Sequence, residues 1–265
     1  MNLYEEAYKC LMESNISKKR IGVDRLYEHW QRKALNRDDF NLEKIEIPGR
    51  PEKPELIPPA QLKRRKLGSE LGRATLIHAI AHIEFNAINL ALDAVYRFRD
   101  MPDDYYADWL KVASEEAYHF SLLNERLENM GYHYGDFPAH NGLWEMVLKT
   151  GHDVMIRMAL VPRVLEARGL DVTPGMMERL ATAGDSETVD ILKIILRDEI
   201  GHVAIGSYWF KYCCKLRDLN PEETFRNLLN EFMGGTLRGP FYMEGRLQAG
   251  FTQKEMDDLV AMMPT

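Results

Sequence analysis

The chain has 265 residues, 45% of them hydrophobic and 28% charged, with a formal net charge of −7. This is the composition of a soluble globular protein large enough to bury a sizeable core, and the negative charge argues against a large nucleic-acid face. No apolar run approaches the roughly 18 residues needed to cross a bilayer, the acidic start is unlike a signal peptide, and the three cysteines form no C-x-x-C motif, so we expect a cytoplasmic protein without a disulfide framework.

The first 68 residues divide into a helical part and a proline-rich part. Residues 1–36 have the apolar spacing of amphipathic helix. Residues 37–68 include five prolines within twelve positions, and proline disfavours helix at and before its own position. We therefore expect an extended arm that wraps the main body. The wrapping should cover the apolar side chains of the arm, which are Ile45, Ile47, Leu56 and Ile57.

Long helices are predicted from residue 69 to residue 217. The first begins after the N-cap Ser69 and ends near residue 98, and the second runs from about residue 102 to Gly131. The third covers about 143–168 and ends at Gly169, with a kink at Pro162. A shorter piece that opens with Thr173 and a proline continues it after a break. The fourth helix runs from about 185 to 217.

The last 48 residues are predicted to form a helical tail. One helix begins at Pro221, and another begins at Thr252, where Glu255 stands at capping-box spacing. No strand periodicity is present at any length, so the predicted fold is all-α. By composition the chain divides into an N-terminal extension (1–68), a four-helix bundle (69–217) and a C-terminal tail (218–265).

Two copies of one motif carry the candidate chemistry. Glu116 and His119 on the second helix, and Glu199 and His202 on the fourth, each have Glu-x-x-His spacing and are each preceded by another acid. Residues three apart share a helix face, so each motif points a carboxylate and an imidazole the same way. The first and third helices each supply one further glutamate. Bundle proteins use this set for a dinuclear carboxylate site. The six candidate metal ligands are Glu84, Glu116, His119, Glu166, Glu199 and His202.

The spacing of the ligands supports the bundle. Glu84 and Glu116 are 32 positions apart, with their midpoint in the turn at residue 100, so an antiparallel hairpin places them at the same height. Glu166 and Glu199 are 33 apart, but Gly169 is expected to end the third helix. About eleven residues of rise, roughly 16 Å, are then missing. The piece after Thr173 can supply this rise.

The ligand types favour two iron ions, with manganese or a mixed manganese–iron pair as alternatives. Four carboxylates balance two divalent ions, which leaves a neutral site that can be buried. Carboxylate with imidazole suits iron or manganese better than structural zinc. Asp198 and Glu115 directly precede ligands and can orient a ligating histidine, or they are a solvated acidic edge. His82 is four residues from His78. The two histidines form a second metal pair or, more simply, provide hydrogen bonds in the core or behind the site.

At these residues the sequence resembles a ferritin-like family of bacterial proteins of largely unassigned function, over roughly residues 45–220. The resemblance implies a ferritin-like fold and the same six ligands, but no substrate. More distantly, the arrangement is similar to the tRNA-modifying diiron hydroxylases and other diiron monooxygenases, which implies oxygen activation. The stretches that carry the resemblance are His78–Glu84, Tyr134–His140, Leu165–Asp171 and Arg197–His202.

Three functions are compatible with these residues and their spacing. The first is an oxidoreductase that activates dioxygen at a diiron site and hydroxylates an organic substrate, either a small molecule or a modified nucleoside, with an electron-donor protein as partner. The second is a ferroxidase or other iron-handling protein without an organic substrate. The third is a metal-free helical interaction protein, for which the ligands would be coincidence. The long extensions at both ends disfavour a storage cage and favour a monomer or small homo-oligomer. The basic run 63–66 meets a phosphate group or is simply solvated.

Overall fold

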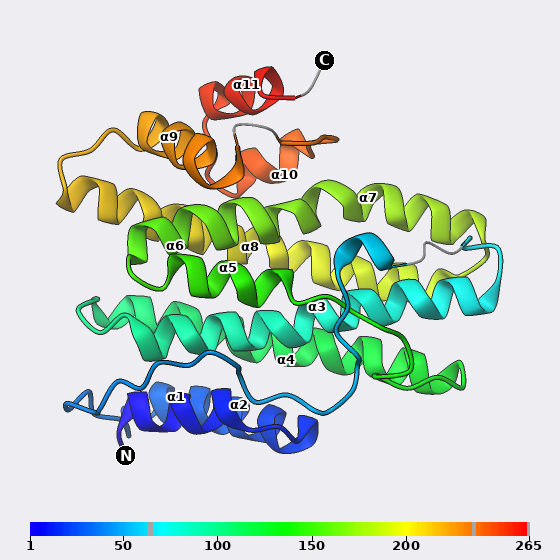
Figure 1. The fold of residues 1–265 in the computed structure, drawn as a ribbon, viewed down its shortest axis with the longest axis horizontal. Helices are drawn as coiled ribbons and strands as arrows, with labels where there is room; N and C mark the ends of the chain where they lie inside the picture. Colours follow the sequence, from blue (N-terminus) through cyan, green and yellow to red (C-terminus); the bar gives the residue numbers. More distant parts are fainter. Residues whose placement is uncertain (63–65, 235–236, 264–265) are drawn as a thin grey trace. The chain divides into compact units, whose positions relative to one another are not determined.

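The computed structural model describes residues 1–62, 66–234 and 237–263, and every regular element in these ranges is a helix (Figure 1). The all-α prediction is therefore confirmed for the described residues, and their arrangement is consistent with a helical bundle. The chain forms two compact units, residues 1–148 and 149–265. The three-part division by composition stays a prediction, and most of the basic run at 63–66 lies outside the described residues.

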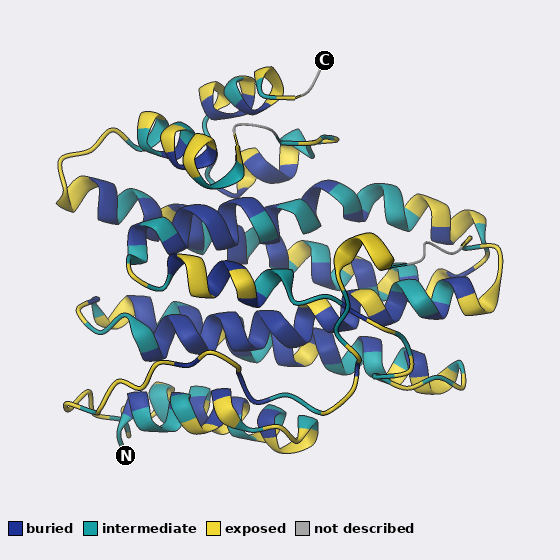
Figure 2. Cartoon of the chain, in the orientation of Figure 1, coloured by how far each residue is buried: buried dark blue, intermediate teal, exposed yellow. Residues whose placement is uncertain are grey.

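The first unit is built on the hairpin of α3 (Glu70–Arg97) and α4 (Asp103–Asn129). Ser69 caps α3 by accepting a hydrogen bond from the amide of Gly72, as predicted. Two aspartates in the first turn of α4 favour its start, because carboxylates stabilise the positive end of a helix. Figure 2 shows buried residues along nearly the whole length of α3. The hairpin is thus the core of this unit.

The N-terminal region forms two helices on this hairpin. They are α1 (Leu3–Met12) and α2 (Ile16–Gln31), capped by Asn2 and Asn15. In Figure 1 both lie along the hairpin, with α1 in contact with α3 and α2 in contact with α4. The Nζ atom of the fully buried Lys19 donates hydrogen bonds to the carbonyl oxygens of Cys10 and Leu11 and to the Asn89 side chain. The end of α1 is therefore anchored both to α2 and to α3.

The proline-rich segment is an extended arm within the first unit, as predicted. Apart from a short 3₁₀ turn at Pro59–Gln61, its described residues form no helix. Its backbone bonds to the end of α1, where the Gly49 amide donates to the Leu11 carbonyl. It also pairs with the loop before α5 (Gly142–Thr150) through Ile57 and Ala139. Ile45 is buried as expected, but the same expectation for Ile47 is wrong, because its side chain is 60% exposed.

The second unit contains the largest departure from the predicted helices. Its third-helix region consists of α6 (Val154–Leu160), a π-helix called η2 (Val161–Glu166) and α7 (Ala167–Thr182). The expected end at Gly169 and the expected new start at Thr173 are both wrong. The Thr173 hydroxyl instead bonds to the Gly169 carbonyl inside α7, and the helix continues through Pro174. The kink expected at Pro162 takes the form of the π-helix.

The long helix α8 (Ser186–Leu216) packs against α6, η2 and α7, and the tail packs on these elements. The tail consists of α9 (Pro221–Met233), α10 (Met243–Gln248) and α11 (Gln253–Ala261). The predicted capping box of Thr252 and Glu255 is present. The short helix α10 was not predicted.

Two further sequence expectations are tested by the fold. The cysteines at positions 10, 213 and 214 are all free and buried. Within the described ranges, α3 is long and apolar enough to cross a bilayer, although no single uninterrupted apolar run was found in the sequence. Of its most apolar 18-residue stretch, 78% is buried inside the structure. This is the behaviour of a core helix and is consistent with a soluble protein.

Candidate metal centre

The α3–α4 hairpin brings three of the predicted ligands together inside the first unit. Glu84 comes from α3, and Glu116 and His119 come from facing positions of α4. One ligand atom from each lies within 4.8 Å of the others, and all three residues are buried. The helices were predicted to place Glu84 and Glu116 at one height, and this is where they lie. A buried Glu/His group of this kind can hold a metal ion.

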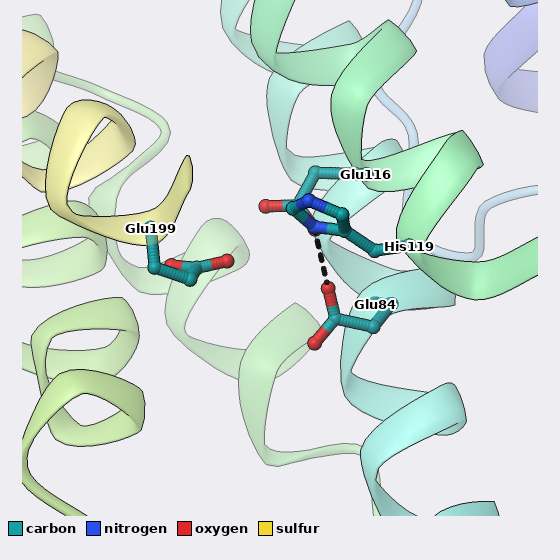
Figure 3. Close-up of side chains that lie close together, drawn as sticks. All are labelled: Glu84, Glu116, His119 and Glu199. Atoms are coloured by element: carbon teal, nitrogen blue, oxygen red, sulfur yellow. Dashed lines mark hydrogen bonds and ion pairs between the residues drawn. The ribbon is translucent and has the colours of Figure 1, made fainter. Parts of the chain in front are cut away.

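His119 lies close to both carboxylates of this group. His119 Nδ1 lies 3.2 Å from Glu84 Oε2 and 3.5 Å from Glu116 Oε2. Figure 3 shows the first of these contacts, between His119 of α4 and Glu84 of α3. Burial and the charge of Glu116 raise the pKa of Glu84 to about 8. Burial alone would lower the pKa of His119, but hydrogen bonds and charges from Glu116 and Glu84 raise it to about 11.

The two buried carboxylates and the imidazole form an environment that would be stabilised by a bound cation. Without one, two carboxylates in a buried site repel each other, and the site takes up protons to reduce that repulsion. A divalent ion would replace those protons, because carboxylate and neutral imidazole are its natural ligands. The buried glutamates and histidine of the first unit therefore have the chemistry needed to hold a metal ion.

The second unit carries the other three predicted ligands. Glu199 and His202 lie on α8, with His202 Nδ1 at 3.5 Å from Glu199 Oε1. Glu166 is the last residue of η2. A π-helix is rare and, as a single turn within α-helix, is often found at functional sites. All three residues are buried, at 9% exposure or less, although carboxylates are seldom buried unless they are paired.

The residues predicted to support the site have these contacts. Glu115 pairs with Lys111 at 3.5 Å, and its side chain is 30% exposed. Asp198 pairs with the neighbouring Arg197 at 2.8 Å. His82 engages a loop of the first unit. The carbonyl oxygen of His140 can only accept, so His82 Nε2 donates to it (3.1 Å), and the Tyr134 hydroxyl donates to His82 Nδ1 (2.8 Å). Their roles behind the metal ligands stay predictions.

Burial lowers the pKa values of both His78 and His82 to about 4, which keeps the two rings neutral. His78 Nε2 accepts a hydrogen bond from the Gly135 amide, and its ring stacks on Tyr134. Both histidines therefore contact the loop that follows α4. This matches the simpler of the two expectations for the pair, hydrogen bonding within the core.

Sequence reasoning missed one buried charged residue beside a ligand candidate. Arg163 lies three positions before Glu166, is fully buried, and pairs with Glu255 of the tail at 2.6 Å. The available signal was a lone arginine within the apolar run 158–165. A charge in such a run is either at the surface or paired, and the partner lies 92 positions away.

Comparisons with known proteins identify relatives but no activity. A family described as "Protein of unknown function (DUF455)" matches residues 12–257 of the chain. An uncharacterized protein of Haemophilus influenzae (strain ATCC 51907 / DSM 11121 / KW20 / Rd) is 46% identical over 265 residues, which cover 96% of this chain and 92% of that protein. No solved structure matches the chain.

Proposed function

The chain belongs to the DUF455 family of proteins of unknown function, and we propose that it is a dinuclear metal protein that binds two iron ions. The observation that carries the proposal is the burial of every predicted ligand: four glutamates and two histidines, none more than 9% exposed. Burying four carboxylates without compensation is costly, and two divalent ions balance their charge. The six residues are Glu84, Glu116, His119, Glu166, Glu199 and His202.

In this proposal the ligands of the two units form one site within a ferritin-like four-helix bundle. The helices would be α3, α4, α8 and the continuous α6–η2–α7. Each Glu-x-x-His pair, on α4 and α8, would face a single glutamate from α3 and from η2. The matched separations of 32 and 33 positions support this pairing.

We further propose that the protein is an oxidoreductase acting on an organic substrate. Bound iron would supply the capacity to activate dioxygen. The residues of the chain would bind the ions, exclude water through their burial, and hold a proton on His119 or Glu84 that leaves when the metal binds. The covered site and the extensions at both ends favour this reading over a ferroxidase or storage protein. An electron-donor protein and a small-molecule or nucleoside substrate would be its partners.

Metal analysis of protein purified from iron-replete cells tests the proposal. We expect two irons per chain in the wild type and fewer than one in Glu116→Gln. Glu125→Gln is the matched control, because Glu125 is an exposed glutamate on the same helix. Two irons retained in Glu116→Gln would contradict the assignment.

Aerobic addition of Fe(II) separates the two iron functions. Oxidation that stops near two irons per chain, in a monomer or small oligomer by light scattering, supports the oxidoreductase. Uptake of tens of irons per chain into a large assembly supports storage instead.

A further inference from the structure

The segment that carries Glu166 is held by unusual contacts within the second unit. Glu166 ends a π-helix of six residues, whereas the neighbouring α6 and α7 are α-helical. Each hydrogen bond of a π-helix spans one residue more than in an α-helix, and the form is rare and less favourable, so it persists only where other contacts hold it. The missing amide of Pro162 explains why an α-helical bond is absent here, but not why the widened form is kept.

The first of these contacts is a fully buried ion pair. Arg163 and Glu255 are 0% and 2% exposed, and their nearest side-chain atoms, Nη2 and Oε1, lie 2.6 Å apart. The guanidinium carbon also lies between 4.1 and 4.9 Å from the centres of three aromatic rings. These rings come from α8, α9 and the turn before α11, and they belong to Phe210, Phe225 and Phe251. The pair therefore fixes the side chain three positions before Glu166 to the tail.

Two further contacts tie the residues after Glu166 to the same tail. Arg168 donates hydrogen bonds to the backbone carbonyl oxygens of residues 238–240. Asp171 accepts two hydrogen bonds of 2.8 Å from Arg246 of α10, and both residues are buried. We call these contacts, together with the Arg163–Glu255 pair, the tail clamp. The clamp thus contacts the helix three positions before Glu166, and again two and five positions after it.

From this geometry we infer that the tail clamp sets the direction of the Glu166 carboxylate, and that Arg163 and Glu255 are positioning residues for the metal site. Stability alone would not require the charged pair, because a buried ion pair is often no more stabilising than apolar side chains of the same volume. The ion pair does, however, fix the orientation of the Arg163 side chain. Its guanidinium must lie against one Glu255 oxygen, between the three aromatic side chains. The inference rests on the proposed function, since it gives Glu166 a metal to bind.

The test compares a broken pair with a removed pair. Arg163→Met leaves Glu255 buried without its cation, so this variant should be less stable than the wild type. Arg163→Met with Glu255→Met removes both charges, and we expect its melting temperature to return towards that of the wild type. Two readouts are then taken on both variants. The first is hydrogen exchange of the amides of 161 and 163–167 in metal-free protein, and the second is Mn(II) binding followed by electron paramagnetic resonance.

If the clamp positions Glu166, both variants exchange these amides at least tenfold faster, and the weaker of two Mn(II) sites loses at least tenfold in affinity. The stable double variant decides the matter, because a merely structural pair would leave its Mn(II) binding unchanged. Leu229→Ala, a buried residue of α9 outside the clamp, controls for general loosening of the tail. Wild-type exchange or wild-type Mn(II) affinity in the double variant would overturn the inference.

The proposed metal site and the role of the tail clamp can be tested independently of each other. A wild-type protein that binds no Mn(II) or Fe(II) would refute the metal site. The exchange measurement would still show whether the clamp holds η2, because that measurement is made without metal.

Discussion

The two units present their candidate ligands on helices of very different regularity. In the first unit, α3 and α4 run without interruption for 28 and 27 residues, and a short turn sets Glu84 opposite Glu116. In the second unit, Glu166 lies at the end of a π-helix. The first arrangement depends on local features, namely a cap, a turn and an apolar face. The second depends on side chains that lie about 45 to 90 positions further along the chain.

This difference predicts different sensitivities. Changes in the tail should loosen the residues around Glu166 and leave the three ligand candidates of the first unit undisturbed. Changes in the first unit should alter stability by removing helix caps or changing the protonation of its ligand candidates. They should not change the structure of η2. The following experiments test this division.

The largest effect is expected from Arg246→Met, which breaks the second ion pair of the tail clamp. Asp171 would stay buried with only the more distant Arg168 guanidinium, at 3.9 Å, to balance its charge, at a cost of about 3 kcal/mol in the free energy of unfolding. Urea denaturation measures this cost. Arg226→Met is the control, because the Arg226–Asp258 pair ties α9 to α11 while partly exposed and should contribute about 0–1 kcal/mol. Equal costs for the two variants would show that the clamp is not a special part of the tail.

The next largest effect is expected at Gly206, where α8 meets η2. A Cβ atom at this position would lie 2.2 Å from Pro162 Cγ, and a proline ring cannot turn away. Gly206→Ala should therefore cost roughly 3 kcal/mol. Gly169→Ala has no atom within 4 Å of its new Cβ and should be neutral or stabilise α7 by about 0.5–1 kcal/mol. If both alanines were tolerated, the close packing of α8 on the π-helix would be refuted.

The hairpin of the first unit could be predicted from sequence because its rules are local. Ser69 is a favourable N-cap and predicts the start of α3, and Gly131 predicts the end of α4. The midpoint between Glu84 and Glu116 falls in the turn between the two helices. The Glu-x-x-His spacing then places His119 on the same face as Glu116. Contact among these three side chains follows from the arithmetic of an antiparallel pair, and the structure confirms it.

The path from Pro162 to Thr182 could not be predicted in the same way. Gly169 and the Thr173–Pro174 pair have the local character of a helix end and a helix start, yet both lie within α7. Two tertiary contacts override them, because Arg168 and Asp171 bond to the tail. Within α7 itself, the Thr173 hydroxyl donates to the Gly169 carbonyl. The lone Arg163 in an apolar run indicates that a partner is needed, but nothing in the residues around Glu166 indicates where in the chain the partners lie.

A smaller effect, on pH dependence, should belong to the first unit alone. The pKa of Glu84 is raised to about 8 in the folded state, so its contribution is fully present below its ordinary value of 4.5 and is lost as pH rises through 8. The raised pKa of His119 acts in the same direction, from its ordinary value of 6.5 up to about 11, so it adds to the loss within this range. In the presence of chelator, stability should fall by at least roughly 2 kcal/mol from pH 6 to pH 8, the part due to Glu84. Urea denaturation at both pH values measures this.

The control for this effect is Glu84→Gln, which keeps an uncharged polar side chain and removes the titration. Its stability should depend less on pH than that of the wild type. Equal dependence in both proteins would assign the effect to groups outside the candidate site. With Mn(II) present the wild-type dependence should weaken or reverse, because the ligands must lose protons to bind the ion.

The smallest effect is expected from a comparison of two helix caps. Both cap a helix with a hydroxyl group, but only one of them is linked to the tail clamp. Ser69 caps α3 in the first unit, and Thr252 caps α11 in the second. Either residue replaced by alanine should cost about 1 kcal/mol, since each loses one hydrogen bond to a helix amide. Thr252, however, forms a capping box with Glu255, the carboxylate that binds Arg163.

Thr252→Ala should therefore speed hydrogen exchange at 161–167, about 90 positions away in the sequence, whereas Ser69→Ala should not. The comparison is made at equal loss of stability, so general loosening cannot produce the difference. The expected acceleration is a fewfold, smaller than in Arg163→Met, because the ion pair is weakened but not removed. If the two caps changed exchange at η2 equally, α11 would be a passive cover, and the direction of Glu166 would have to be set by α8 and the Asp171–Arg246 pair.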